Sequence, residues 1–168
     1  MNLILQSSIV TLRKSVTLLS NISSEVLSDS SVSPYYSCIG SHVRHILDFY
    51  DCILNGMDTK YIDLTERRRD ERMHCDCNYS IENINRVINE ISKIDNLTIK
   101  DRYCVIDDLG LGKIEINYSL GAILAQANSH AIHHYAIINF ILDRLGIIFD
   151  DTDFGYNPTT PKANTNLS

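Results

Sequence analysis

Apolar residues recur every three or four positions in four long stretches of the chain, which is the spacing of an amphipathic helix. The first stretch covers residues 3–27, and the second runs from about residue 36 to residue 54. Serine-rich residues 28–34 separate the two, and Pro34 disfavours helix at the residue before it. The pair Asn55-Gly56 follows the second stretch and predicts its end.

The second half of the chain predicts two more helices and a hairpin. Ser80 is the expected cap of the third helix, whose apolar face is Ile81, Ile84, Val87, Ile88 and Ile91. Residues 97–106 and 113–118 are rich in β-branched and aromatic residues and flank a turn with two glycines, which favours a hairpin. Ser119 is the expected cap of the last helix, which ends near Gly146. Charged residues 57–79 predict an ordered loop with one turn of helix.

Together these elements predict an all-α fold class: a four-helix bundle with a small β-hairpin inserted before the last helix. A chain of 168 residues is long enough for one domain with a real core and short for two. Residues 1–150 are the expected single domain, and residues 151–168 are an expected polar C-terminal tail.

Composition narrows the function classes. The formal net charge of -6 argues against a nucleic-acid partner, since there is no basic excess to neutralise phosphates. No apolar run approaches the roughly 18 residues that span a bilayer, and the N-terminus lacks the pattern of a signal peptide. A cytoplasmic location without membrane attachment is therefore expected. The 5 cysteines are an odd number and scattered, which favours reduced thiols.

The fourth helical stretch carries the strongest candidate chemistry. His130 and His134 are four residues apart, so they lie one above the other on one side of a helix. Apolar residues lie within roughly 60° of His130 on the helical wheel, so both imidazoles share the face expected to turn inward. An inward imidazole needs a partner, and a divalent metal satisfies both rings at once. The alternative is a pair of core histidines bonded to backbone or to each other.

A metal site open to solvent typically has three protein ligands. The second helical stretch offers the third ligand as either His42 or His45. Helical phase mildly favours His42, which is nearer the centre of the apolar face. However, His45 has Phe49 and Cys52 on its own side, so that side can also be buried. The residues alone leave both histidines open.

Three segments in order carry a family resemblance: GSHVRHILDFYDCILNG, then YIDLTERRRDERMHCD, then SHAIHHYAIINFILDRLG with FGYNPTT. The chain resembles the DinB/YfiT-like family of metalloenzymes, which are four-helix bundles and often homodimers. By motif, the resemblance implies His45, His130 and His134 as the metal ligands, with nickel or zinc as the metal. The sequence departs from the family at Phe49, where close relatives often have histidine.

The resemblance implies a metal-dependent enzyme acting on a small molecule, either a transferase that uses a low-molecular-weight thiol or a hydrolase. The rival hypothesis is a non-catalytic module in which the metal, or the fold alone, supports stability or partner binding. A pocket open beside the histidines favours the enzyme, and a closed site favours the module.

Other polar residues have two interpretations each. His133 is expected at the surface; the alternatives are a hydrogen bond to one of the ligands or a place as a substitute ligand. Asp48 is expected to be solvated, although it can also orient an imidazole. The charged run Arg67–Arg72 predicts a solvated face, or one or two arginines at the pocket mouth that hold a substrate carboxylate. The segment His74-Cys75-Asp76-Cys77 is a weak zinc motif, because no second pair of ligands follows at finger spacing.

Overall fold

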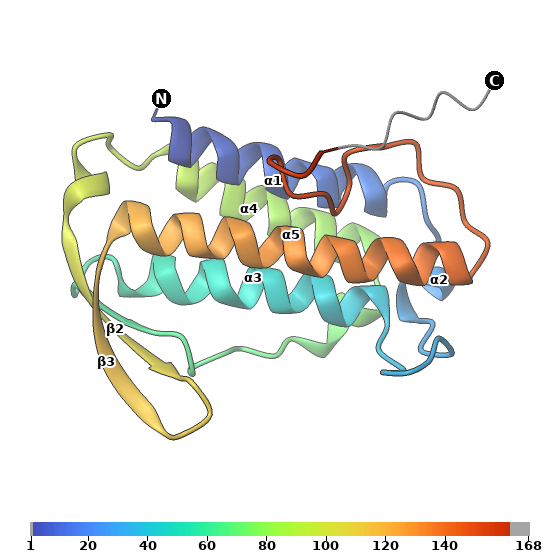
Figure 1. Cartoon of the computed structure of the whole chain (residues 1–168), viewed down its shortest axis with the longest axis horizontal. Helices are drawn as coiled ribbons and strands as arrows, with labels where there is room; N and C mark the ends of the chain where they lie inside the picture. The colour runs from blue at the N-terminus through green and yellow to red at the C-terminus, as the bar shows by residue number, and fades with distance from the viewer. Residues whose placement is uncertain (1, 162–168) are drawn as a thin grey trace.

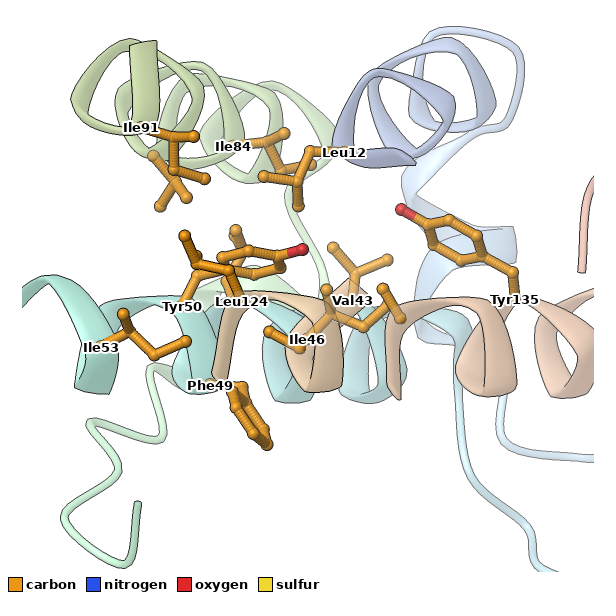
Figure 2. Packing of buried hydrophobic residues seen from close by; sticks show 14 of the residues in the cluster. Leu12, Val43, Ile46, Phe49, Tyr50, Ile53, Ile84, Ile91, Leu124 and Tyr135 are labelled. Carbon is orange, nitrogen blue, oxygen red and sulfur yellow. The ribbon is translucent and has the colours of Figure 1, made fainter. Parts of the chain in front are cut away.

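Residues 2–161 are described by the structure, a computed structural model of the chain. The elements of this part of the chain are the helices α1 (Leu3–Leu19), α2 (Ser24–Ser28), α3 (Ile39–Gly56), α4 (Cys77–Ser92) and α5 (Leu120–Arg144), the strands β1 (Tyr61–Asp63), β2 (Arg102–Asp108) and β3 (Lys113–Ser119), and the 3-10 turns η1 (Glu71–His74) and η2 (Thr98–Lys100). The four long helices form two layers, with α1 beside α4 and α3 beside α5 (Figures 1 and 2).

The core fills the space between the two layers. Figure 2 shows Leu12 of α1 and Ile84 of α4 pointing toward Tyr50 of α3, all fully buried. Tyr135 of α5 enters the same core, where its hydroxyl lies 2.6 Å from Ser15 Oγ and donates to the carbonyl of Thr11 at 2.8 Å. These bonds satisfy a polar atom that burial would otherwise penalise.

Phe49 points to the other side of α3, away from α1 and α4 (Figure 2). It is nevertheless buried, and its ring lies 5.2 Å from that of His130, measured between centroids. The layer formed by α3 and α5 therefore has two distinct faces. One face forms the core, and the opposite face carries the histidines.

The prediction of an all-α four-helix bundle is wrong, because the chain also forms a three-stranded mixed sheet. The predicted hairpin is present as β2 and β3, but its first strand begins at Arg102 because Thr98–Lys100 forms a 3-10 turn. β1 pairs in parallel with β2, with Tyr61 opposite Cys104, and extends the hairpin into a sheet. The fold is thus mixed α and β, with helix predominating, since a strand from the predicted loop joins the sheet.

Two helix starts also differ from the predictions. The third helix begins after Asp76, whose side chain accepts a hydrogen bond from the Tyr79 backbone N–H, and Ser80 lies inside it. The Ser80 hydroxyl is buried and donates to the carbonyl of Met73. The second helix begins at Ile39 rather than near residue 36, because Tyr36 has a positive φ of 50° that a helix does not allow. The Ser119 cap of α5 is confirmed.

The first predicted helix is interrupted. α1 ends at Leu19, and the separate short helix α2 starts after Ser23, whose hydroxyl accepts from the Val26 backbone N–H. Asparagine and serine at residues 20–23 offer side-chain bonds that compete with helix continuation. Among residues 2–161, no helix combines the length and apolar character that crossing a bilayer requires.

The start of the predicted polar tail packs against α5. Phe154 is fully buried and stacks on Tyr135 with ring centroids 4.6 Å apart. Lys14 of α1 forms an ion pair of 2.9 Å with Asp151. Residues 162–168 of the predicted tail lie outside the described residues.

Candidate metal centre

Two helices supply all the histidines of the candidate site. His42 and His45 belong to α3, and His130 and His134 belong to α5, which lies beside α3 (Figure 1). Because His130 and His134 are separated by four residues on one helix, their rings lie on the same face, edge to face, with centroids 4.5 Å apart. The His45 ring lies 4.8 Å from each of them.

His45, His130 and His134 form a cluster within metal-binding distance. Each ring offers one nitrogen, and these three nitrogens lie within 4.8 Å of one another. Three atoms at this separation have a common centre within about 2.8 Å of each, and Zn–N bonds are ~2.0–2.1 Å. Side-chain shifts of under about 1 Å thus bring all three nitrogens to bonding distance of one cation. It is the single such cluster of three or more ligand residues in the part of the chain that is described.

One nitrogen of this cluster lacks any hydrogen-bond partner. Nε2 of His130 is buried and makes no hydrogen bond within the described residues. A buried polar atom without a partner costs roughly 1–3 kcal/mol, so such atoms are rare in folded proteins. A cation at the cluster centre would accept this lone pair. The donor set therefore fits a divalent metal that prefers nitrogen ligands, such as zinc or nickel.

His42 lies beside the cluster and contacts a member of it. Its Nδ1 lies 2.9 Å from Nδ1 of His134, and its Nε2 lies 2.8 Å from the hydroxyl of Ser37. If His134 Nδ1–H donates to His42 and His42 Nε2–H donates to Ser37, then Nε2 of His134 keeps a free lone pair. Hydrogen bonds of this kind fix the orientation and tautomer of a metal-ligating imidazole. With these tautomers, His42 would position His134 for a metal.

We expect His42→Ala to weaken divalent-metal binding by about 10- to 100-fold, because His134 loses the acceptor that orients it. His42→Asn should recover part of the affinity, since its amide oxygen can accept from His134 Nδ1. Dissociation constants from competition with a chromophoric chelator would measure both effects. An unchanged constant in His42→Ala would show that His42 does not orient the site.

Burial keeps the cluster uncharged. Desolvation, followed by the charge of Arg67, lowers the pKa of His45 to about 4. Desolvation, followed by the neighbouring histidines, lowers the pKa of His134 to about 3. The pKa values of His42 and His130 are lowered as well, chiefly by burial. Near neutral pH all four rings are neutral, which is the form that binds a metal.

The metal-free protein should lose stability as the pH falls from about 7 to about 5. An unfolded chain protonates histidine near pH 6.5, whereas His45 and His134 in the folded state protonate only near 4 and 3. The unfolded state thus binds more protons below pH 6.5, so the free energy of unfolding decreases there. Urea unfolding with chelator at both pH values measures this. The variant His134→Gln keeps every other titrating group, so its free energy of unfolding should decrease less between the two pH values. An equal decrease in wild type and variant would show that His134 does not cause the pH dependence.

An arginine from the charged run reaches the cluster. Nη1 of the Arg67 guanidinium donates to Nδ1 of His45 at 3.1 Å, and its Nε donates to the carbonyl of Leu64 at 3.1 Å. Arg72 instead pairs with Asp76 at 2.9 Å, and Arg68 and Arg69 are exposed. Most of the run is therefore a solvated face, as predicted, and Arg67 is the member that enters the site.

Asp48 matches neither of its interpretations. The residue is only 4% exposed, so it is not solvated, and its ion pair is with Arg44 at 3.8 Å rather than with an imidazole. Desolvation raises its pKa. His133 is exposed, as expected, and its ring lies 5.4 Å from that of His134.

The cysteines show no metal site of their own within the described residues. Cys75 is exposed and Cys77 is buried at the start of α4, so the weak zinc motif gathers no ligand set there. Burial raises the pKa of Cys52 to about 11, which keeps this thiol protonated. Ser37, which bonds His42, had no signal in the sequence, because it lies in an irregular segment before α3.

No family model, curated protein or solved structure matches this chain. The family therefore stays a prediction from the motifs.

Proposed function

We propose that this protein is a divalent-metal-dependent enzyme that acts on a small molecule at His45, His130 and His134. The observation that carries the proposal is the convergence of three neutral imidazoles around one centre, together with the unpartnered, buried Nε2 of His130. Such an arrangement is costly unless a ligand completes it.

The small number of protein ligands favours catalysis over a purely structural metal. The cluster has three histidines and no fourth ligand among residues 2–161, whereas structural zinc sites almost always have four protein ligands. The three histidine side chains are half-buried, whereas Nε2 of His130 itself is buried. When bound, a divalent cation here would lower the pKa of a coordinated water or thiol and supply a nucleophile near neutral pH.

The chain's own residues would hold and shape this centre. Ser37 and His42 orient His134, and the ring of Phe49 covers His130. An apolar groove of about 280 Å³ is lined by Ser37, His133 and Phe140 but by none of the three cluster histidines, so it is a neighbouring feature and not the site itself.

We further propose thiol transfer as the reaction class and nickel or zinc as the metal, with hydrolysis as the second reaction. The support is the resemblance of the histidine motifs to those of the DinB/YfiT-like family. Among residues 2–161 no carboxylate forms a hydrogen bond or ion pair with the three rings, although the charge of Asp107 acts on His130. The nucleophile would therefore be the coordinated water or thiol rather than one made by a side-chain base.

The test is metal analysis of untagged protein, followed by thiol-transfer and hydrolysis assays with and without chelator. The proposal expects about one nickel or zinc per chain and turnover that chelator abolishes. Metal without turnover on any thiol or ester, combined with a lower Tm after metal removal, would favour the non-catalytic module. Absence of metal after incubation with either ion would overturn the site itself.

A further inference from the structure

Arg67 and a metal cannot use His45 at the same time. A guanidinium only donates hydrogen bonds, so Nδ1 of His45 must accept from Arg67, and the single proton of the neutral ring then lies on Nε2. A metal needs a ring nitrogen with a free lone pair. If it binds Nε2, the proton moves to Nδ1 and the bond from Arg67 breaks. If it binds Nδ1, it replaces Arg67 directly.

Metal binding therefore releases the guanidinium but leaves it near the site. Nε of Arg67 stays bonded to the carbonyl of Leu64, which is buried next to β1. Leu64 is itself held by a hydrogen bond of 2.9 Å from its backbone N–H to the carbonyl of Ile106. The released end of Arg67 thus has little freedom to move away from His45.

The released guanidinium also has no carboxylate partner. No described acidic group lies within 4.0 Å of Arg67, whereas Arg44, Arg72 and Arg86 each form an ion pair. Asp48 is buried in the same region, but its ion pair is with Arg44.

The charges of Asp48 and Asp107 act on Arg67 and His130 without an ion-pair contact to either. A dication on three neutral histidines beside a partly buried guanidinium therefore still leaves an excess of positive charge in a desolvated site. Such an excess is costly unless an anion neutralises it.

We propose that the ligand of the loaded site carries a carboxylate, which Arg67 binds while the metal binds another group of the same molecule. This inference rests on the proposed function, because it requires the metal. A planar guanidinium fork matches a carboxylate, and one unpaired arginine contributes the single positive charge that a carboxylate balances. Metal binding breaks the hydrogen bond between Arg67 and His45, and the carboxylate of the ligand gives Arg67 a new partner. The metal and the carboxylate should therefore bind cooperatively.

The experiment compares two thiols of nearly the same shape, one with a carboxylate and one with a neutral amide. The arginine variants separate the effect of Arg67 from other differences between the thiols. Untagged protein loaded with Co²⁺ is titrated with mercaptoacetate and with its neutral amide, mercaptoacetamide, and the thiolate-to-cobalt absorption band reports binding. The wild type should bind mercaptoacetate about tenfold or more tightly than the amide, from one charge-assisted contact. Arg67→Gln should lose this preference and still bind the amide, whereas Arg68→Gln, which removes the same charge from an exposed neighbour, should keep it.

The outcomes separate this inference from the proposed function. Equal binding of the two thiols by the wild type, or an undiminished preference in Arg67→Gln, would overturn the role of Arg67 and leave the metal site intact. A wild type that binds no Co²⁺ would overturn both. Arg67→Lys keeps the charge without the fork and should show an intermediate preference, and its amide binding checks that the variant is folded.

Discussion

His134→Ala is expected to abolish stable metal binding, with the dissociation constant rising by at least about 100-fold. Loss of a residue that only orients a ligand costs 10- to 100-fold, so loss of a ligand should cost more. His134 also lies at the centre of the cluster, since its ring contacts those of His45 and His130 and bonds to His42. Metal analysis of untagged protein after dialysis measures the result directly.

His133→Ala is the matched control for this variant. His133 is the adjacent residue on α5, but its side chain is exposed and it is not part of the cluster. Its removal should leave the metal content unchanged. Metal retained in full by His134→Ala, or lost equally in both variants, would show that the ion binds elsewhere on the chain.

Gly56→Ala should destabilise the protein by about 3 kcal/mol, toward the upper end of the range for overpacking. Inside a helix, replacing glycine by alanine normally stabilises a protein by roughly 0.5–1 kcal/mol. A loss of stability in Gly56→Ala would therefore reverse the usual sign. The reason is a close approach between α3 and β1. A Cβ on Gly56 would collide with the carbonyl oxygen of Tyr61 and lie 2.8 Å from Cα of Ile62, and backbone atoms cannot rotate away.

Asn55→Ala controls for helix propensity, because Asn55 is the exposed neighbour in the same turn. It should change the urea midpoint little, while Gly56→Ala lowers it clearly. A neutral or stabilising Gly56→Ala would mean that β1 can move away from α3 at no cost, and that the strand is not fixed by this contact.

The sequence predicted the parts of the site that depend on one helix. Four-residue spacing places His130 and His134 on the same face of α5 wherever that helix packs. The choice between His42 and His45 depends on how α3 packs against α5. The spacing of residues within one helix carries no information about that packing. In the structure His45 completes the cluster and His42 bonds to His134. That His45 ligates a metal stays a prediction.

The fold shows the same division between local and distant interactions. The four long helices follow from apolar periodicity, and the hairpin follows from two β-rich segments that are close in sequence. β1 was not predicted, because its 3 residues carry almost no pattern and their partner in β2 lies some forty positions away. Asp76 was missed as a cap because the preceding charged segment concealed where α4 begins.

The parallel pairing of β1 with β2 also imposes an order on assembly. The backbone bond that holds Leu64, and through it Arg67, comes from Ile106, which is synthesised long after α3. Non-local strand pairing closes late in folding, because the entropy of a long loop must be overcome first. His45 and His130 are separated by about twice as many residues as Leu64 and Ile106, and α5 is synthesised after Ile106, so the imidazoles close the longer loop. During folding the half of the centre that selects the anion would thus mature ahead of the cation-binding half.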